Sequence, residues 1–444
     1  MPTMPSKGRL TSRRAANALL SCAVLGAIAW TATGCSNSGP IENRGGIPVA
    51  PKQQSIRHVF VITMENKSFK DTFGTSKQAP DLQAMAKQGA LLTQYYGTGH
   101  VSLDNYVAMM SGQPSTKETQ SDCVQGFNDV VADGWDAANP KVLKAKNGMG
   151  CVYPKEVKTF VNQLDEVRLT WKGYMGDMGN DPTREAATCG HPKIGAIDNT
   201  HSAQAPTADV PQGDQYATRH NPFMYFHSII DDQAYCNSHD VNLEANLQKD
   251  LRSIDTTPNF AFITPNLCDD GHDGDGTGAQ PCANGDKGGL TSVNAFLKKW
   301  VPIIQASPAY QKDGLVIINF DESADMVPAG KSESGGVTTI TLNLPGESCC
   351  GQQVGPNVKR PDDAIIPVSA KLAYKLHYQG VGGDRTGALL LSKFIKPGTV
   401  SETPYNHYSL LKSLENIFQT REYLGYADNK NLAPFDSDVF INLQ

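Results

Sequence analysis

The stretch HVFVITMENKSFKDTFG, residues 58–74, begins like a core strand and then changes character. Residues 58–63 are nearly all apolar or β-branched, a pattern typical of a buried β-strand. Glu65 and Asn66 follow at once, so that a carboxylate and a carboxamide stand where the strand ends. Packing alone does not require these two polar groups, and they indicate a site at the end of the strand.

Strand-like and helix-like patterns alternate along the chain after this first strand. Pro80 and Asp81 open the first helix pattern, and Gly89 ends it. Helices are predicted over 80–88, 102–112, 290–304 and 407–418, and further strands over 90–97, 259–266, 314–323 and 386–395. This alternation predicts an α/β fold with a central, mainly parallel sheet.

The composition limits the class of partner. The chain has 444 residues, of which 39% are hydrophobic, enough to fill a sizeable core. The formal net charge of −6 gives no broad basic surface, which argues against nucleic acid as a partner. Composition alone says no more about function.

The first 34 residues have the features of a signal peptide. A positively charged region precedes the apolar run LLSCAVLGAIAW, from Leu19 to Trp30. Cys35 directly follows small residues, as in a bacterial lipobox, and is expected to be lipidated; plain secretory cleavage is the alternative. Residues 35–56 are predicted to form a flexible tether. We therefore expect a periplasmic or cell-envelope protein that contacts the membrane through a lipid anchor at Cys35.

The cysteines of the exported chain are expected to form disulfide bonds. Ten cysteines, less Cys22 and Cys35, leave eight, and an even number after an export signal is typical of disulfides. Nearest neighbours in sequence suggest two pairs, Cys123–Cys151 and Cys268–Cys282. The adjacent residues Cys349 and Cys350 are expected to pair elsewhere, because a bond between neighbours is geometrically unfavourable.

Residues 113–220 lack the periodicity of the segments around them. They are rich in Asp, Gly, Lys and Asn and contain three cysteines. We expect an inserted cap over the edge of the sheet, within one domain that spans 57–444. Most of the substrate pocket is expected to come from this insertion.

Three predicted strands end in polar clusters. Glu65-Asn66 follows the first strand, NLCDDGHD (266–273) follows another, and Asp321-Glu322 follows a third. Because ligands bind at the carboxyl ends of parallel strands, these clusters are expected to converge in one crevice. Clustered carboxylates repel one another unless a cation holds them, so the pattern predicts a metal site with oxygen ligands. Acidic residues that merely cap loops are the alternative.

Ser102 and three histidines are the candidates for the chemistry. Ser102 opens a predicted helix, where free amides and the helix dipole favour an alkoxide; simple helix capping is the alternative. His272, His407 and His220 lie beside polar sequence, and each fits a ligand, a general acid or a donor to phosphate. A surface loop histidine is the alternative for each.

Several of these motifs, in this order, resemble the bacterial phosphoesterase family of secreted acid phosphatases and non-specific phospholipases C. They are ENKSF (65–69), HVSLDNY (100–106), ITPNLCDDGHD (263–273), DES (321–323) and HYSLLKSLENIF (407–418). The resemblance runs from about residue 57 to about 428, and the spacing of Ser102 and Gly112 is similar to that of sulfatase nucleophiles. It implies an alkaline-phosphatase-like three-layer sandwich with a cap inserted at 113–220.

The resemblance also implies roles for individual residues. It makes Ser102 the nucleophile and assigns the metal to five side chains: Glu65, Asn66, Ser102, Asp321 and Glu322. His272 and His407 are expected to be catalytic, and three residues to bind substrate: Asn105, Asp270 and His220. Two-zinc alkaline phosphatases carry an Asp-His pair where this chain has Asp321-Glu322, so one divalent metal ion is expected.

These roles predict a phosphatase that works through a phosphoserine. Ser102 attacks phosphorus, the leaving alcohol takes a proton from a histidine, and water cleaves the phosphoserine. A phospholipase C that cuts a phospholipid diester is the alternative, and a surface lipoprotein acting only as a binding module is the non-enzyme alternative. No aromatic cluster suited to a choline cage occurs in 113–220, which favours the phosphatase and a phosphorylated small molecule as its substrate.

Overall fold

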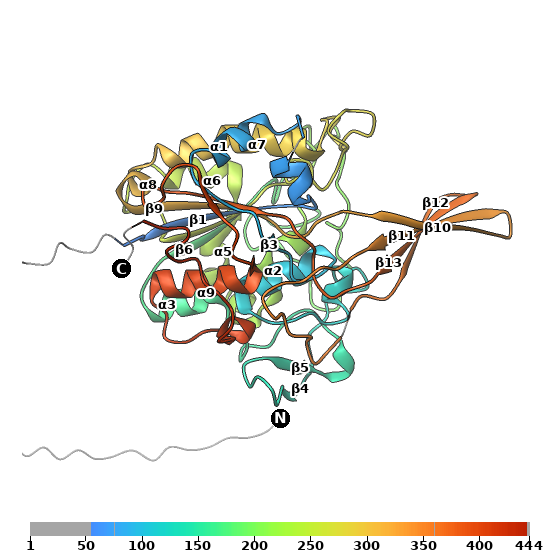
Figure 1. Ribbon diagram of the computed structural model, residues 1–444, viewed down its shortest axis with the longest axis horizontal. Coiled ribbons are helices and arrows are strands. Elements are labelled where there is room, and N and C mark those ends of the chain that lie inside the picture. The colour runs from blue at the N-terminus through green and yellow to red at the C-terminus, as the bar shows by residue number, and fades with distance from the viewer. Residues whose placement is uncertain (1–54, 75, 359, 442–444) are drawn as a thin grey trace, which may run out of the picture. The chain divides into compact units, whose positions relative to one another are not determined.

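A mixed sheet forms the middle layer of the computed structural model, which describes residues 55–74, 76–358 and 360–441 (Figure 1). Its strands are β1 (His58–Met64), β2 (Ala90–Leu92), β6 (Trp171–Met175), β7 (Asp240–Asn242), β8 (Phe260–Thr264), β9 (Gly314–Phe320), β14 (Ala388–Leu391) and β15 (Thr399–Ser401). The order across the sheet is β15-β2-β14-β9-β1-β8-β6-β7. The block from β9 to β7 is parallel, while β14 runs antiparallel to β9 and β2.

The central strand β1 faces two separate cores. Val59 and Val61 point to one face of the sheet, and Phe60 and Ile62 point to the other. All four side chains are fully buried, and burying each stabilises the fold by about 1.5–3 kcal/mol. A strand buried on both faces reads as the continuous apolar run seen in the sequence.

Helices cover both faces of the sheet and complete three layers (Figure 1). One face carries α1 (Pro80–Ala86), α6 (Leu243–Asp250) and α7 (Gly289–Gln305). The other carries α2 (Ser102–Ser111), α3 (Phe160–Glu166) and α9 (His407–Phe418). Three shorter helices are α4 (His227–Ile230), α5 (Gln233–His239) and α8 (Pro308–Asp313). The predicted α/β sandwich with a central, mainly parallel sheet is confirmed.

The elements predicted from periodicity are present, with one change. The strand expected over 90–97 is divided into β2 and a short strand, β3 (Tyr95–Tyr96), which pairs with β16 (Tyr405–Asn406). Gly89 precedes β2 because a Cβ there would lie 2.0 Å from the backbone oxygen of Leu390. The close approach of two backbones, in addition to helix termination, therefore explains this glycine.

The region 113–220 differs from the expected cap. It supplies β6, an internal strand of the central sheet, and helix α3, whose Phe160 lies in the main core. The expectation that 113–220 only covers the sheet edge is therefore wrong for the part that forms α3 and β6. The region also forms a hairpin of β4 (Ala132–Trp135) and β5 (Leu143–Ala145). All residues of β4 are exposed. Short segments separated by polar loops concealed these elements in the sequence.

A second sheet of four strands extends away from the central sheet (Figure 1). Its strands are β10 (Val327–Ser334), β11 (Val337–Leu344), β12 (Ala364–Ser369) and β13 (Leu372–Tyr378). The order is β10-β11-β13-β12, and β10 is exposed along its whole length. No strand was expected in this region, although VTTITLNL in β11 is rich in the β-branched residues typical of strands.

Four disulfide bonds occur within the described residues. Two are the predicted nearest-neighbour pairs, Cys123–Cys151 and Cys268–Cys282. Cys189–Cys236 is the third. The fourth joins Cys349 to Cys350, so the expectation that these two residues pair elsewhere is wrong. The other six cysteines in the described part of the chain pair among themselves.

The expected signal peptide, nearly all of the tether 35–56, and the lipidation candidate Cys35 lie outside the described residues. No helix in the described part of the chain combines the length and the hydropathy needed to cross a membrane.

Candidate active site

Three strand ends meet at one edge of the sheet, as the strand-end rule predicts. β8, β1 and β9 are parallel neighbours, and each leads directly into a loop with buried carboxylates. The backbone amide of Glu65 donates to the backbone oxygen of Asp270 over 2.9 Å. The amide of Asn66 donates to Oδ1 of Asp321 over 2.9 Å. The structure therefore brings the three predicted polar clusters together.

Ser102 is the first residue of α2 and lies beneath this edge. Val101 occupies the capping position, so Ser102 does not act as the helix cap considered above. Its hydroxyl instead donates to Oε2 of Glu65 over 2.8 Å. Asp122 accepts from the amide of Leu103 over 2.9 Å and takes over the capping. The serine oxygen is thus free of a capping role and lies at the positive end of a helix.

Glu65 is the most connected carboxylate of the site. Besides the bond from Ser102, its Oε1 accepts from the Tyr106 hydroxyl over 2.5 Å and its Oε2 from Nδ2 of Asn66 over 3.2 Å. Burial, with the charges of Asp321 and Asp270, holds the pKa of Glu65 well above its usual range. A nearby cation would favour its ionised form.

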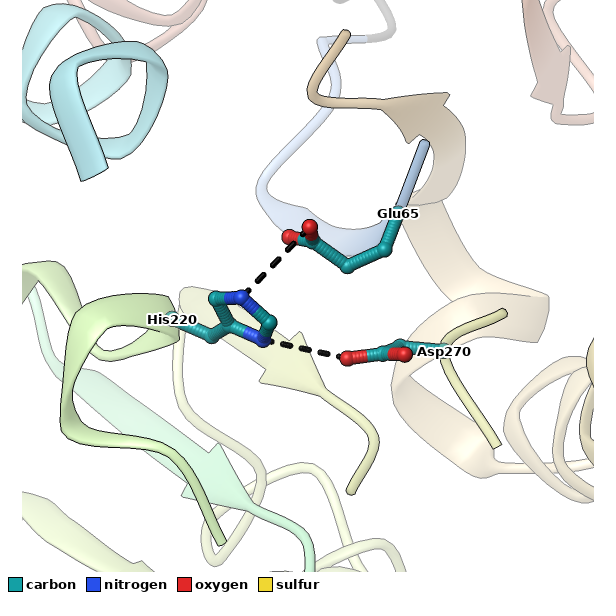
Figure 2. Close-up of side chains that lie close together, drawn as sticks. All are labelled: Glu65, His220 and Asp270. Atoms are coloured by element: carbon teal, nitrogen blue, oxygen red, sulfur yellow. Dashed lines mark hydrogen bonds and ion pairs between the residues drawn. The ribbon is translucent and has the colours of Figure 1, made fainter. Parts of the chain in front are cut away.

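Glu65, His220 and Asp270 form the most compact group of possible metal ligands in the described residues (Figure 2). One donor atom from each lies within 4.8 Å of the others. Nε2 of His220 is 3.4 Å from Oε2 of Glu65, and its Nδ1 is 3.1 Å from Oδ2 of Asp270. The imidazole stacks on the Tyr106 ring at a centroid distance of 5.4 Å. His220 and Asp270, predicted to bind substrate, thus lie where a cation would sit.

These residues fit a divalent cation on two observations. Among the described residues, Nε2 of His220 and Oδ2 of Asp321 are buried without a hydrogen-bond partner. Burial, followed by the positive charge of Arg219, lowers the pKa of His220 well below its usual range and keeps it neutral, the state in which imidazole binds metals. Carboxylate oxygens and one imidazole suit a hard or borderline ion.

His407 does not have the catalytic geometry expected from the sequence. Its Nε2 contacts the backbone oxygen of Asp321 at 2.6 Å, and its Nδ1 contacts the Tyr95 hydroxyl at 2.9 Å. Burial lowers its pKa to about 4. A neutral imidazole with both nitrogens engaged cannot protonate a leaving group, so the catalytic assignment of His407 conflicts with the geometry. It holds the start of the loop after β9.

Glu322 lies apart from the triad and contacts His100. Its Oε2 pairs with Nδ1 of His100, while Nε2 of the same ring lies 3.0 Å from Oδ2 of Asp384. Burial alone would lower the pKa of His100, but the two carboxylates outweigh it and raise that pKa. This ion-paired cluster ties three loops together just before Ser102. Because its carboxylate is ion-paired with His100, whereas Oδ2 of Asp321 is buried without a partner among the described residues, Glu322 is a weaker metal candidate than Asp321.

Asn105 holds the turn that leads to Ser102 and does not face the phosphate position inferred from the sequence. Its Oδ1 accepts from the amides of Thr98 and Gly99, over 2.7 and 3.1 Å. Its Nδ2 donates to the backbone oxygens of Gly99 and Val101, over 2.9 and 3.2 Å. These bonds use the whole amide, so Asn105 holds the turn that leads to Ser102.

His272 lies at the more open side of the site. Its Nδ1 is 2.7 Å from Oδ1 of Asp273, and its ring lies 5.9 Å from that of His220. Nη2 of the buried Arg219 is 3.3 Å from Nε2 of His272. This exposed histidine is therefore the predicted catalytic histidine that keeps access to a substrate.

Four further residues complete the site and were absent from the predicted set: Lys67, His100, Tyr106 and Arg219. Lys67 joins two loops by donating to the backbone oxygens of Gly271 and Asn66, over 2.6 and 3.1 Å. Lys67 directly follows Asn66, and Arg219 directly precedes His220. His100 and Tyr106 are the first and last residues of the HVSLDNY motif. Proximity to a predicted residue was the signal that could have identified them.

A family model described as the Phosphoesterase family matches residues 75–421. An acid phosphatase from Penicillium chrysogenum, described as phosphate-repressible, is 23% identical over 54% of this chain and 43% of its own length. An acid phosphatase from Aspergillus fumigatus is 21% identical over 69% of this chain and 52% of its own length. The chain thus spans about half the length of the curated relatives it matches. These relatives are fungal, so the predicted resemblance to bacterial members of the family stays a prediction.

Solved structures give more distant similarities. A protein of the alkaline phosphatase superfamily from Vibrio parahaemolyticus has 11% identity and a TM-score of 0.40, over 84% of this chain and 68% of that one. A wild-type alkaline phosphatase has 9% identity and a TM-score of 0.40, over 89% of this chain and 100% of that one.

Proposed function

Because the chain belongs to the Phosphoesterase family, we propose that it hydrolyses phosphate monoesters through a phosphoserine at Ser102. The observation that carries this proposal is the position of the Ser102 hydroxyl. It lies at the start of α2, 2.8 Å from Oε2 of Glu65, and Glu65 in turn belongs to the buried group with His220 and Asp270. A hydroxyl nucleophile, a helix N-terminus and a cation-binding group in contact suit phosphoryl transfer.

We assign one divalent cation to Glu65, His220 and Asp270, with Asp321 as the next candidate ligand. Asp321 supports this set because its Oδ2 is buried without a partner among the described residues. Asn66 donates to Glu65 and Asp321 and adds a neutral carboxamide beside them. A divalent cation bound here would neutralise the carboxylates and stabilise negative charge on the phosphoryl oxygens.

Ser102 attacks phosphorus in line with the leaving alcohol in this proposal. The hydrogen bond to Glu65 orients the hydroxyl, and the free amides at the start of α2 favour its negatively charged form. The bond between phosphorus and the leaving oxygen breaks as the bond to Oγ forms, and the hydroxyl proton passes to its hydrogen-bond acceptor, Oε2 of Glu65. Water then attacks the phosphoserine and releases phosphate, which restores the serine.

We assign proton donation to the leaving alcohol to His272. His407 and His220 are both buried, His407 between the Tyr95 hydroxyl and the backbone of Asp321 and His220 between Glu65 and Asp270, so neither is open to a leaving group. His272 is exposed, and Oδ1 of Asp273 contacts its Nδ1 at 2.7 Å, which orients the ring. Arg219, beside it, adds a buried positive charge for the phosphate oxygens.

A rate comparison tests the proposal. Purified protein with added divalent metal should hydrolyse p-nitrophenyl phosphate faster than bis(p-nitrophenyl) phosphate or phosphatidylcholine. Ser102→Ala should lose about a thousandfold or more in kcat. Ser111→Ala is the matched control, since the hydroxyl of this buried serine at the other end of the helix bonds only to the backbone of Val107 and Gln113. Preference for a diester would indicate the phospholipase C alternative, and turnover of none of these substrates would indicate a binding module.

We also propose that the protein is exported, with Cys35 as a lipidation site. The disulfide bonds support an oxidising compartment. If Cys35 carries a lipid, Cys35→Ser should move the protein from the membrane fraction to the aqueous fraction. An unchanged distribution would remove the anchor from the proposal.

A further inference from the structure

A polar cavity of about 430 Å³ lies at the same edge of the sheet as Ser102, and the proposed chemistry does not use it. Its volume falls within the range of about 300–1,000 Å³ that is typical of small-molecule sites. The residues that line it include two aromatic and four charged ones: Phe69, Tyr96, Lys70, Asp325, Glu347 and Arg385.

Three segments that line the cavity continue loops of the candidate active site. Phe69 lies four residues after Glu65, and Tyr96 precedes the turn that leads into Ser102. Asp325 follows the Asp321-Glu322 pair by three residues. Asp384, which also lines the cavity, lies 3.0 Å from Nε2 of His100. The cavity is therefore joined to the loops of the candidate active site, and we expect the alcohol part of a bound monoester to extend toward it.

Backbone contacts hold the walls in place. The amide of Phe69 donates to the backbone oxygen of Arg385 over 2.9 Å. Tyr96 and Arg385 form an antiparallel bridge, and the amide of Gly97 donates to the backbone oxygen of Asp384 over 3.0 Å. Three segments that are distant in sequence thus present their side chains to one space on a fixed frame.

The charged side chains of the cavity are not paired with one another. Among the described residues, no ion pair involves Arg385, Lys70, Asp325 or Glu347. The Arg385 guanidinium instead lies 4.7 Å from the centre of the Phe69 ring. The cavity therefore offers donors, acceptors and two aromatic rings, Phe69 and Tyr96, at the same time.

Resting on the proposed function, we propose that this cavity binds the alcohol part of the substrate and that this alcohol is polyhydroxylated, as in a sugar phosphate. A hydroxyl both donates and accepts, so it satisfies the carboxylates and the cations together. An acyl chain would cover the half-buried Arg385 and the exposed Lys70, Asp325 and Glu347 without offering any of them a hydrogen bond. A second anionic group would meet Asp325 and Glu347 as well as Arg385. The aromatic rings can cover the apolar face of a sugar.

The test compares two monoesters of primary alcohols, glucose 6-phosphate and ethyl phosphate. Arg385→Gln and Glu347→Gln should each lower the ratio of their kcat/KM values by about tenfold or more, the loss expected for one hydrogen bond to a charged group. Arg421→Gln, at an exposed arginine outside this cavity, is the control and should leave the ratio within about twofold. A ratio unchanged in both cavity variants would overturn the proposal.

Two further measurements separate the alternatives. If Arg385→Gln lowers kcat/KM for fructose 1,6-bisphosphate but not for fructose 6-phosphate, relative to ethyl phosphate, the cavity recognises an anion and the proposal is wrong. Calorimetric binding to Ser102→Ala protein decides the subsite without turnover. Tighter binding of glucose 6-phosphate than of ethyl phosphate, lost on Arg385→Gln, supports the subsite even if hydrolysis fails; equal binding overturns it.

Discussion

The hydroxyl of Ser102 donates a hydrogen bond to Oε2 of Glu65 over 2.8 Å, and this contact joins the start of α2 to the end of β1. Glu65 is fully buried and lies at the corner of the group with His220 and Asp270. The polar ending of the first strand thus places a carboxylate between a candidate nucleophile and a candidate cation. These polar residues contribute less to core packing than apolar ones would, and the site that they form explains their presence.

Glu65→Gln should lower both the bound metal and the rate. The amide keeps the shape of the side chain but carries no negative charge, so we expect a loss of about a hundredfold in kcat/KM and a clear fall in metal content after dialysis. Inductively coupled plasma mass spectrometry and p-nitrophenyl phosphate assays measure the two effects. Tyr106→Phe is the matched variant, because it removes only the donor to Oε1 and should retain the metal. Full metal content and full rate in Glu65→Gln would exclude Glu65 from both roles.

Removing metal should destabilise the protein more at about pH 7.5 than at about pH 5. Burial raises the pKa of Asp321 to about 6, and the pKa of Glu65 is raised as well. A carboxyl whose pKa is raised in the folded state contributes stability at low pH and loses it as pH rises through that value. The metal-free protein therefore loses stability between about pH 4 and pH 7, where a cation would relieve the repulsion.

Thermal unfolding measures this effect. Protein dialysed against a chelator should show a lower Tm than protein reloaded with Mg²⁺, Mn²⁺ or Zn²⁺, and the gap should widen with rising pH. A gap of equal size at both pH values, or no gap with any of these ions, would contradict a cation held by these carboxylates.

His407→Gln should remove a part of the acid sensitivity of the fold. Burial lowers the pKa of His407 from 6.5 to about 4, so its contribution to stability is present above pH 6.5 and is lost as pH falls through about 4. By about pH 5 the wild type should have lost about 2 kcal/mol of unfolding free energy from this group alone. Urea unfolding at about pH 7 and pH 5 measures the loss, with the surface variant His377→Gln as control. The same pH slope in His407→Gln as in wild type would mean that His407 does not titrate as inferred.

The spacing of apolar residues was sufficient to predict the fold class, because it indicates which faces of each strand or helix are buried. The run His58–Thr63 is apolar on both faces of the strand, and β1 indeed lies at the centre of a parallel block. Because ligands bind at the carboxyl ends of parallel strands, Glu65 and Asp321 could be placed at one edge of the sheet before the packing of the helices was known. Both predictions, the buried strand and the shared sheet edge, depend only on residues that are close together in sequence.

Contacts between distant segments could not be inferred in the same way. His220 lies 50 residues from Asp270 in sequence, and its place in the triad depends on how 113–220 packs. His407 opens a helix beside polar sequence, as a catalytic residue often does, yet its two partners, Tyr95 and the backbone of Asp321, come from other elements. Sequence located these histidines near the site but did not reveal their hydrogen-bond partners, which decide their roles.

Asn66→Asp tests whether the neutral carboxamide limits the negative charge of the site. Nδ2 of Asn66 donates to Oε2 of Glu65 over 3.2 Å, so an aspartate would replace a donor with a second carboxylate oxygen. Asn66 has a φ of 56°, a conformation that both Asn and Asp tolerate, and the backbone should not change. We expect the metal-free variant to lose about 1–2 kcal/mol of unfolding free energy, and added cation to stabilise it more than wild type.

Asn147→Asp is the matched control for this change. Asn147 is exposed, also has a positive φ of 58°, and lies in the turn after β5. The same new charge on the same kind of backbone should therefore cost little and should not respond to metal. Unfolding free energies with and without cation, together with the rate on p-nitrophenyl phosphate for a series of metals, measure the difference. If both variants behave like wild type, the carboxamide has no role in charge balance; if only Asn66→Asp changes its metal preference, the charge argument holds.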